Sequence, residues 1–144
     1  MTNARSVFHK LNGLKFRIND FKPLLVVITE SWLFPEISDS AVSISGYSVW
    51  RKDRSSQGGG ILCYFRHDLS VQAIVDDRYL PQPNYNSEIA SVFVKELHLL
   101  LIVIYHPFWD DNNAHDEAIN RISHLFDRAH TQFGEDLRTI LCGD

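Results

Sequence analysis

A short apolar run near the N-terminus, Leu24–Ile28, constrains the fold of this chain more than any other segment. It reads Leu-Leu-Val-Val-Ile, which is short for a helix and rich in β-branched side chains. Such a run is typical of a strand buried on both faces. It leads directly into Thr29 and Glu30. Ligands and metals bind at strand ends in open α/β folds, so Glu30 is a candidate ligand-binding group. The alternative is that Glu30 faces solvent where the strand leaves the core.

Apolar residues at steps of three and four predict two helices. The first covers Ser6–Phe21, with Ser6 as its N-cap. The second covers Ala114–Gly134, with Gly134 at the C-terminal cap. Its buried stripe is expected to comprise Ile119, Ile122, Leu125, Phe126, Ala129 and Phe133.

Runs rich in β-branched and aromatic residues predict further strands. These are Tyr47–Arg51, Ile61–Arg66, a short strand around Val71–Val75, Glu88–Lys95, Leu99–Tyr105 and a buried strand at Leu137–Cys142. The pair Glu88–Lys95 and Leu99–Tyr105 is expected to form an antiparallel hairpin. The polar segment Phe34–Tyr47 is expected to be a loop, and residues 110–113 a turn. Residues 1–144 therefore predict a single α/β domain.

The composition is that of a soluble globular protein, with 44% apolar and 22% charged residues. No apolar run approaches the length of a membrane span, and the N-terminus lacks the apolar core of a signal peptide. Cys63 and Cys142 each lie in an apolar run, which favours free buried thiols in a reducing, intracellular compartment. A secreted protein is the alternative.

Charge is distributed unevenly along the chain. Residues 1–70 carry nine Lys and Arg against six Asp and Glu, a net charge of +3, whereas residues 71–144 carry five against twelve, a net charge of −7. The overall charge of −4 argues against non-specific nucleic-acid binding. It is compatible with a metal-dependent nuclease, because the cation supplies positive charge at the phosphate.

Three oxygen-bearing side chains lie at the edges of apolar segments: Asn3, Glu30 and Asp144. Mg²⁺ binds oxygen ligands, of which one or two are usually carboxylates. Asn3 and Glu30 are therefore candidate Mg²⁺ ligands, and Asp144 a candidate for holding an attacking water. Taken singly, each of the three is equally compatible with a cap or a solvated turn.

The basic segment Arg51–Arg54 precedes Gly58–Gly60. This loop lacks Gly-Lys-Ser/Thr and opens into a strand, which argues against a nucleotide P-loop. A flexible turn and a phosphate-contacting loop both remain open. The seven histidines show no zinc spacing, and no nucleophile elbow or Cys/His pairing suggests covalent catalysis.

Several motifs occur in a fixed order along the chain. They are Asn3-Ala4-Arg5-Ser6, Ile28-Thr29-Glu30-Ser31-Trp32-Leu33, Arg51-Lys52-Asp53-Arg54 with Gly58-Gly59-Gly60, Ile104-Tyr105-His106-Pro107, and Leu141-Cys142-Gly143-Asp144. Taken together, the set resembles the endonuclease/exonuclease/phosphatase superfamily. More narrowly, it resembles the apurinic-type endonuclease domain of non-LTR (LINE-like) retrotransposons.

This resemblance implies a four-layer α/β sandwich with mixed, largely antiparallel sheets. It implies that Asn3 and Glu30 bind Mg²⁺, with Mn²⁺ as an alternative, and that Tyr105 lies near the scissile phosphate. Asp144 would orient the attacking water, whereas Arg51 and Arg54 would contact substrate. The implied reaction is Mg²⁺-dependent nicking of DNA, inside the nucleus or cytoplasm, with a reverse transcriptase domain downstream. No membrane, haem or nucleotide cofactor is implied.

The sequence also departs from the family pattern. It lacks the asparagine expected two residues after Asp144 and the later Ser-Asp-His segment, and His106 stands where relatives often carry arginine. We therefore expect residues 1–144 to be an incomplete N-terminal piece of an endonuclease with little or no activity alone. An inert fragment and a phosphatase of the same fold are the alternatives.

Overall fold

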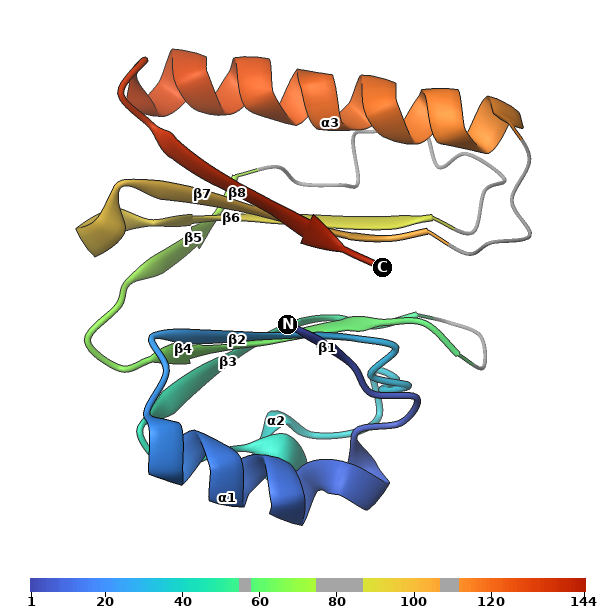
Figure 1. Ribbon diagram of the computed structural model, residues 1–144, viewed down its shortest axis with the longest axis vertical. Helices are drawn as coiled ribbons and strands as arrows, with labels where there is room; N and C mark the ends of the chain where they lie inside the picture. The colour runs from blue at the N-terminus through green and yellow to red at the C-terminus, as the bar shows by residue number, and fades with distance from the viewer. Residues whose placement is uncertain (55–57, 75–86, 107–111) are drawn as a thin grey trace. The chain divides into compact units, whose positions relative to one another are not determined.

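The computed structural model describes residues 1–54, 58–74, 87–106 and 112–144. These residues form two compact units, Met1–Leu69 and Ser70–Asp144, and Figure 1 shows the sheet and helices of each. Each unit contains a four-stranded mixed sheet. The expected α/β class with largely antiparallel sheets is thus confirmed.

Unit 1 contains the sheet β1-β2-β4-β3. Its strands β1 and β2 are parallel, and the other two pairs are antiparallel. In chain order its elements are β1 (Thr2–Asn3), the 3₁₀ turn η1 (Phe8–Lys10), α1 (Leu11–Phe21), β2 (Leu25–Thr29), α2 (Asp39–Val42), β3 (Tyr47–Lys52) and β4 (Ile61–Arg66).

Helices α1 and α2 cover one face of this sheet (Figure 1). Ile18 of α1 and Val42 of α2 pack there with Ile28 and Tyr64. The alternate residues of the central strands point to the other face and are also buried, as Val27 and Cys63 illustrate. The predicted central strand is therefore confirmed, one residue later than its predicted bounds.

The start of the first helix differs from the prediction. Ser6 has a left-handed backbone (φ 76°) and is no N-cap, because the chain enters η1 through Val7, which makes no side-chain cap. The segment expected to be a loop contains the single turn α2. It spans four residues and buries only Val42, so the sequence shows no apolar periodicity there.

Unit 2 contains the sheet β5-β6-β7-β8, with β7 and β8 parallel and the other pairs antiparallel. Its elements are β5 (Val71–Ala73), β6 (Glu88–Val94), the 3₁₀ turn η3 (Lys95–Leu97), β7 (Leu99–Tyr105), α3 (Asn112–Phe133) and β8 (Arg138–Gly143). The predicted hairpin of β6 and β7 is confirmed. Val75 and residues 110 and 111 of the predicted turn lie outside the described residues. Asn112 and Asn113 belong to α3, so the turn prediction was wrong for these two positions and the helix begins two residues earlier than predicted.

Helix α3 lies over one face of the unit 2 sheet (Figure 1). Its buried residues Leu125 and Ala129 contact that face as predicted, but Ile119 is 61% exposed and its neighbour Ala118 is buried instead. The strand predicted at Leu137–Cys142 is confirmed as β8, but the prediction that it is buried was wrong. β8 is an edge strand, so its Ile140 and Leu141 remain about half exposed.

Both cysteines are free thiols, as predicted; Cys63 is buried and Cys142 half-buried. No helix within the described ranges combines the length and apolarity needed to cross a bilayer.

Candidate active site

Asn3 and Glu30 lie at the carboxyl ends of two neighbouring parallel strands. Asn3 pairs with Thr29, the residue immediately before Glu30. Beyond the strands the two chains continue side by side, because the Ser6 N–H donates to Glu30 O (3.0 Å). The expectation that folding brings these two residues to one sheet edge is therefore met within unit 1.

The backbone holds both groups in defined positions. The Arg5 N–H donates to Asn3 Oδ1 (3.2 Å), which orients the amide oxygen. Glu30 adopts a left-handed conformation (φ 51°), which non-glycine residues rarely adopt. Strain of this kind is concentrated at functional sites.

The glycine loop supports the turn after Glu30. Gly60 O accepts a hydrogen bond from the Ser31 N–H, and Gly59 O from the Trp32 N–H, both at 3.0 Å. Gly60 itself has φ +85°, and a Cβ there would lie 2.5 Å from Ser31 Oγ. The loop thus needs glycine in order to pack against the strand end.

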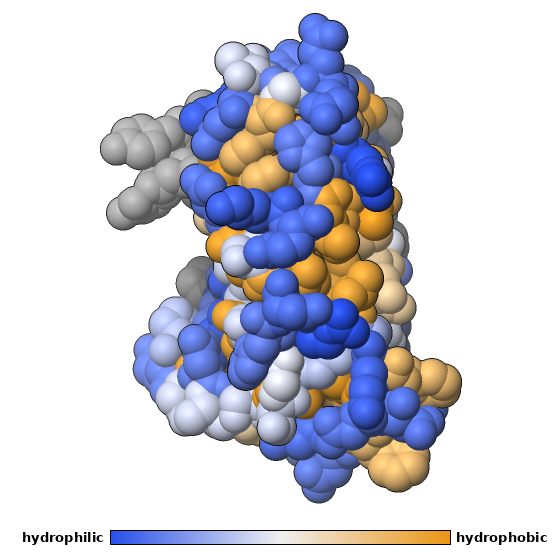
Figure 2. Space-filling view, turned by 90° about the vertical axis from the view of Figure 1, so that its left-hand side faces the viewer, coloured by the Kyte–Doolittle hydropathy of each residue, from blue (hydrophilic) through white to orange (hydrophobic). Residues whose placement is uncertain are grey.

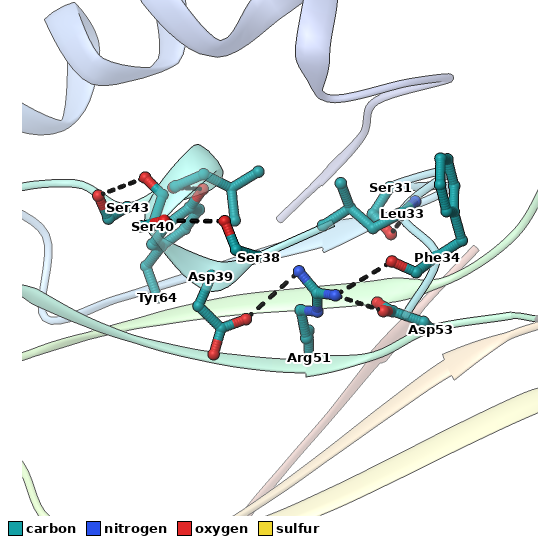
Figure 3. A network of polar contacts seen from close by, with 11 residues as sticks. Ser31, Leu33, Phe34, Ser38, Asp39, Ser40, Ser43, Arg51, Asp53 and Tyr64 are labelled. Atoms are coloured by element: carbon teal, nitrogen blue, oxygen red, sulfur yellow. Dashed lines mark hydrogen bonds and ion pairs between the residues drawn. The ribbon is translucent and has the colours of Figure 1, made fainter. Parts of the chain in front are cut away.

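Arg51 joins this region to α2 (Figure 3). Its guanidinium donates to Asp53 (2.7 Å), lies 3.3 Å from Asp39 and donates to Phe34 O (3.2 Å). Burial raises the pKa of the Asp53 carboxyl above its usual value, and Arg51 opposes that rise. The guanidinium expected to contact substrate is therefore occupied by internal partners, whereas Arg54, half-buried, follows β3 at the start of the glycine loop.

A cavity of about 400 Å³ lies between β1 and the first helical segment. Asn3 lines it, together with His9, Lys10 and Arg17. The Lys10 ammonium donates to Ala4 O, which holds its charge beside the end of β1. The cavity thus combines a polar strand end with cationic side chains.

In unit 2 the predicted site residues Tyr105 and Asp144 lie in one row across the sheet together with Glu88. Glu88 of β6 pairs with Tyr105 of β7. On the other side of β7, the His106 N–H donates to Asp144 O (2.8 Å) and the Asp144 N–H to Ile104 O (3.2 Å). This continues the parallel ladder, so Tyr105 has Glu88 on one side and Asp144 on the other.

Sequence reasoning left two members of this region without a role. Glu88 belongs to the row, but only strand register reveals its position. His106 contacts Ser87 Oγ through its Nδ1, and its ring lies 4.2 Å from that of His115. The four residues Asn3, Glu30, Tyr105 and Asp144 are thus brought together as two pairs, one in each unit. Their convergence on a single substrate stays a prediction.

The donor atoms of unit 1 suit a hard divalent cation. Asn3 supplies an amide oxygen and Glu30 a carboxylate, which are ligands that Mg²⁺ accepts while keeping several waters. Thr29 Oγ1, on the sheet face of Asn3, is buried and has no hydrogen-bond partner within the described part of the chain. The same part contains no cluster of three or more His, Cys, Asp or Glu that could form a complete protein cage. The residues therefore fit a sparsely ligated Mg²⁺ and not a structural zinc.

Sequence comparison identifies neither a matching protein-family model nor a matching curated protein. Structural comparison does identify similar structures. The 3′-5′ exonuclease NExo from Neisseria meningitidis has a TM-score of 0.66 at 14% identity, over 99% of this chain and 55% of that chain. The same protein, described as a 3′ phosphatase and bound to a product DNA hairpin, matches with a TM-score of 0.63 at 13% identity, over 99% and 55%.

Two further structures extend the likeness. An AP endonuclease from Archaeoglobus fulgidus matches with a TM-score of 0.57 at 14% identity, over 99% of this chain and 55% of that chain. The endonuclease domain of TRAS1, a telomere-specific non-LTR retrotransposon, matches with a TM-score of 0.52 at 18% identity, over 99% and 56%.

The chain has the endonuclease/exonuclease/phosphatase fold. The resemblance expected from the ordered motifs is therefore confirmed at the level of fold. The chain spans a little over half the length of each of these proteins. Because identities are below one fifth, the endonuclease/exonuclease/phosphatase fold is what the likeness establishes, and activity is a separate question.

Proposed function

We propose that this chain forms part of a Mg²⁺-dependent endonuclease that hydrolyses DNA phosphodiester bonds. The observation that carries the proposal is the pairing of Asn3 with Thr29, which sets an amide and the Glu30 carboxylate at adjacent strand ends. A fold shared with nucleases supports it, since the ends of parallel strands are binding positions in open α/β proteins.

Each residue has a proposed role in this reaction. Asn3 and Glu30 would hold Mg²⁺, or Mn²⁺ in its place. The cation would stabilise negative charge on the phosphate. Tyr105 would donate a hydrogen bond to a phosphate oxygen, and the Asp144 carboxylate would accept one from the attacking water. Arg54 would contact the DNA backbone, whereas Arg51 could take the same role only by exchanging one of its internal carboxylate partners for a phosphate.

DNA is the proposed substrate because one structural neighbour is bound to a product DNA hairpin. The cationic residues around the cavity beside Asn3, Lys10 and Arg17 among them, favour a polyanion. By likeness to the TRAS1 domain we further propose that the nick primes reverse transcription by a domain downstream, in the nucleus or cytoplasm. A phosphatase is the second candidate, favoured by the phosphatase activity named for a structural neighbour.

Metal binding by the 144-residue chain tests the proposal without requiring turnover. We expect the Mn²⁺ electron paramagnetic resonance signal to be reduced on addition of wild-type chain, and Mg²⁺ to compete. Glu30→Ala and Asn3→Ala should each weaken this binding at least tenfold. The control Glu36→Ala removes an exposed carboxylate six residues away and should leave binding unchanged. Equal binding by Glu30→Ala and the wild type would contradict the metal site.

Plasmid nicking tests the expectation that these residues alone are nearly inactive. The family resemblance implies a histidine beyond Asp144, so we expect only trace Mg²⁺-dependent relaxation of supercoiled DNA. Robust nicking that is lost in Glu30→Ala would overturn the expected inactivity and support the nuclease. Release of phosphate from a 3′-phosphorylated oligonucleotide without nicking would favour the phosphatase.

A further inference from the structure

The turn after Glu30 alternates between buried and exposed side chains. Ser31 and Leu33 are 0% and 2% exposed, whereas Trp32 and Phe34 are 45% and 50% exposed. Two large aromatic rings are therefore presented to solvent next to the proposed metal ligand. Burying each ring would have stabilised the unit, so their exposure invites a functional explanation.

Trp32 is held in a costly backbone conformation. Its φ is +56°, in the left-handed region that bulky residues avoid. The Trp32 N–H donates to Gly59 O, and the flanking Ser31 N–H donates to Gly60 O. The buried Leu33 fixes the following position. The glycine loop thus maintains a conformation that keeps the indole outside the core.

The backbone of Phe34 is held by Arg51 and not by the glycine loop. Its carbonyl oxygen accepts a hydrogen bond from Arg51, whose guanidinium is paired with Asp39 and Asp53. Figure 3 shows the Phe34 carbonyl facing Arg51 and its ring pointing away from that network. Both aromatic residues are therefore anchored through their backbones while their rings stay available.

We propose that Trp32, supported by Phe34, stacks on an unpaired base of single-stranded or locally opened DNA. Every nucleobase has a π-face, and aromatic platforms beside basic residues are how proteins hold single strands. Lys52 ends β3 and Arg54 follows it at the start of the same glycine loop. Residues 1–70 carry a net charge of +3, so a polyanion matches this surface better than an apolar peptide. Bases stacked in an intact duplex are inaccessible to such a platform. The inference rests on the proposed function and specifies which form of DNA this site prefers.

Oligonucleotide binding tests the platform independently of hydrolysis. Fluorescence anisotropy would compare a labelled single strand of thymidines with one of equal length made of abasic sugars, in EDTA to prevent cleavage. We expect the wild type to prefer the thymidine strand about tenfold. Trp32→Ala should lose that preference, because the abasic strand offers nothing to stack on.

Matched variants separate stacking from folding. Trp32→Phe keeps an aromatic ring and should retain most of the preference. Phe16→Ala removes a ring that is 74% exposed on α1 and should change nothing. Circular dichroism would verify that each variant is folded.

Three outcomes overturn the inference. One is equal preference in Trp32→Ala and the wild type, which leaves the metal site and the nuclease proposal standing. Another is an equal loss of affinity for both strands in Trp32→Ala. If the wild type binds no DNA of either kind, both the platform and the proposed substrate are excluded for this chain.

Discussion

The position that a side chain on Gly60 would occupy is already filled by the Ser31 hydroxyl. An ideal Cβ at Gly60 lies 2.5 Å from Ser31 Oγ and 3.7 Å from the Trp32 backbone nitrogen. The two residues are also joined by a hydrogen bond from the Ser31 N–H to Gly60 O. The turn that carries Glu30 and the glycine loop are consequently one packed unit.

Gly60→Ala should therefore destabilise the chain. The new methyl group would clash with Ser31 Oγ, and the alanine backbone would have to adopt φ near +85°, which alanine disfavours. We therefore expect a loss of about 2–3 kcal/mol in the free energy of unfolding. Gly13→Ala is the matched control, since nothing lies within 4 Å of its Cβ position in α1. There alanine should stabilise by up to about 1 kcal/mol. Urea denaturation of both variants would decide, and similar effects would contradict the packing argument.

Arg51 and Arg54 lie three residues apart, but we expect replacement of Arg51 to affect stability and replacement of Arg54 to affect DNA binding. Arg51→Ala leaves Asp53 without its ion-pair partner, so we expect a loss of about 2 kcal/mol in stability. Arg54→Ala should weaken DNA binding at low salt. Thermal unfolding and anisotropy would be measured on each. A stable Arg51 variant with impaired DNA binding would mean that its guanidinium serves substrate after all.

Tyr64 gives unit 1 a dependence on alkaline pH. Burial raises the pKa of its hydroxyl to about 12, and that hydroxyl donates to Val42 O (2.7 Å). The folded chain therefore retains this proton at pH values where the unfolded chain, with a pKa near 10, has lost it. The resulting stability is present below about pH 10 and is lost as pH rises toward 12, by roughly 2 kcal/mol.

Tyr64→Phe tests this contribution. At neutral pH the variant should lose about 1 kcal/mol with the hydrogen bond to Val42. Between pH 10 and 12 its stability should decline less than that of the wild type. Urea midpoints across this range would measure both effects, and parallel curves for the two proteins would exclude Tyr64 as the source.

The exposed residues of β8 should govern self-association. Ile140 and Leu141 are 45% and 51% exposed on an edge strand, and such edges template pairing with other chains. Replacing both by lysine should lower aggregation, measured by light scattering, without reducing the free energy of unfolding by more than about 0.5 kcal/mol. Apolar surface also occurs elsewhere among the hydrophilic side chains (Figure 2), including Phe16 and Phe21 of α1, so a Phe21→Lys variant serves as control. An equal gain in that variant would show that β8 has no special part.

The pattern of apolar residues predicted many of the strands and helices correctly. Leu99–Tyr105 and Ile61–Arg66 were predicted with their observed bounds, because buried strands leave continuous apolar runs. The sequence predicted less accurately which face of α3 is buried. It predicts that Ile119 lies in the core, whereas Ala118 is buried there and Ile119 is exposed. A small residue close to the sheet carries little hydrophobic signal. The turn α2 was missed because four residues are too few to show a helical repeat of apolar side chains.

The candidate site was only partly accessible from the sequence. Glu30 was identified because it ends a buried strand, and Asn3 because it precedes the first helix. The strand β1 that ends at Asn3 was not predicted, and its parallel pairing with β2 sets the two residues together. The row of Glu88, Tyr105 and Asp144 depends on strand register, which no local pattern specifies. The sequence also did not predict the internal partners of Arg51, because an arginine in a basic segment gives no local sign of whether it will contact phosphate or carboxylate.

The close approach of β8 to β7 at Gly143 restricts which residues can occupy position 143. A Cβ there would overlap Ile104 Cγ2 and the Ile104 carbonyl oxygen, and would lie 3.1 Å from its carbonyl carbon. Trimming Ile104 to alanine relieves the first clash but not the others, since the peptide group remains. No compensating substitution at the neighbouring strand can therefore rescue a larger residue at 143. The aspartate that follows keeps its place beside Tyr105 only in variants that preserve this glycine.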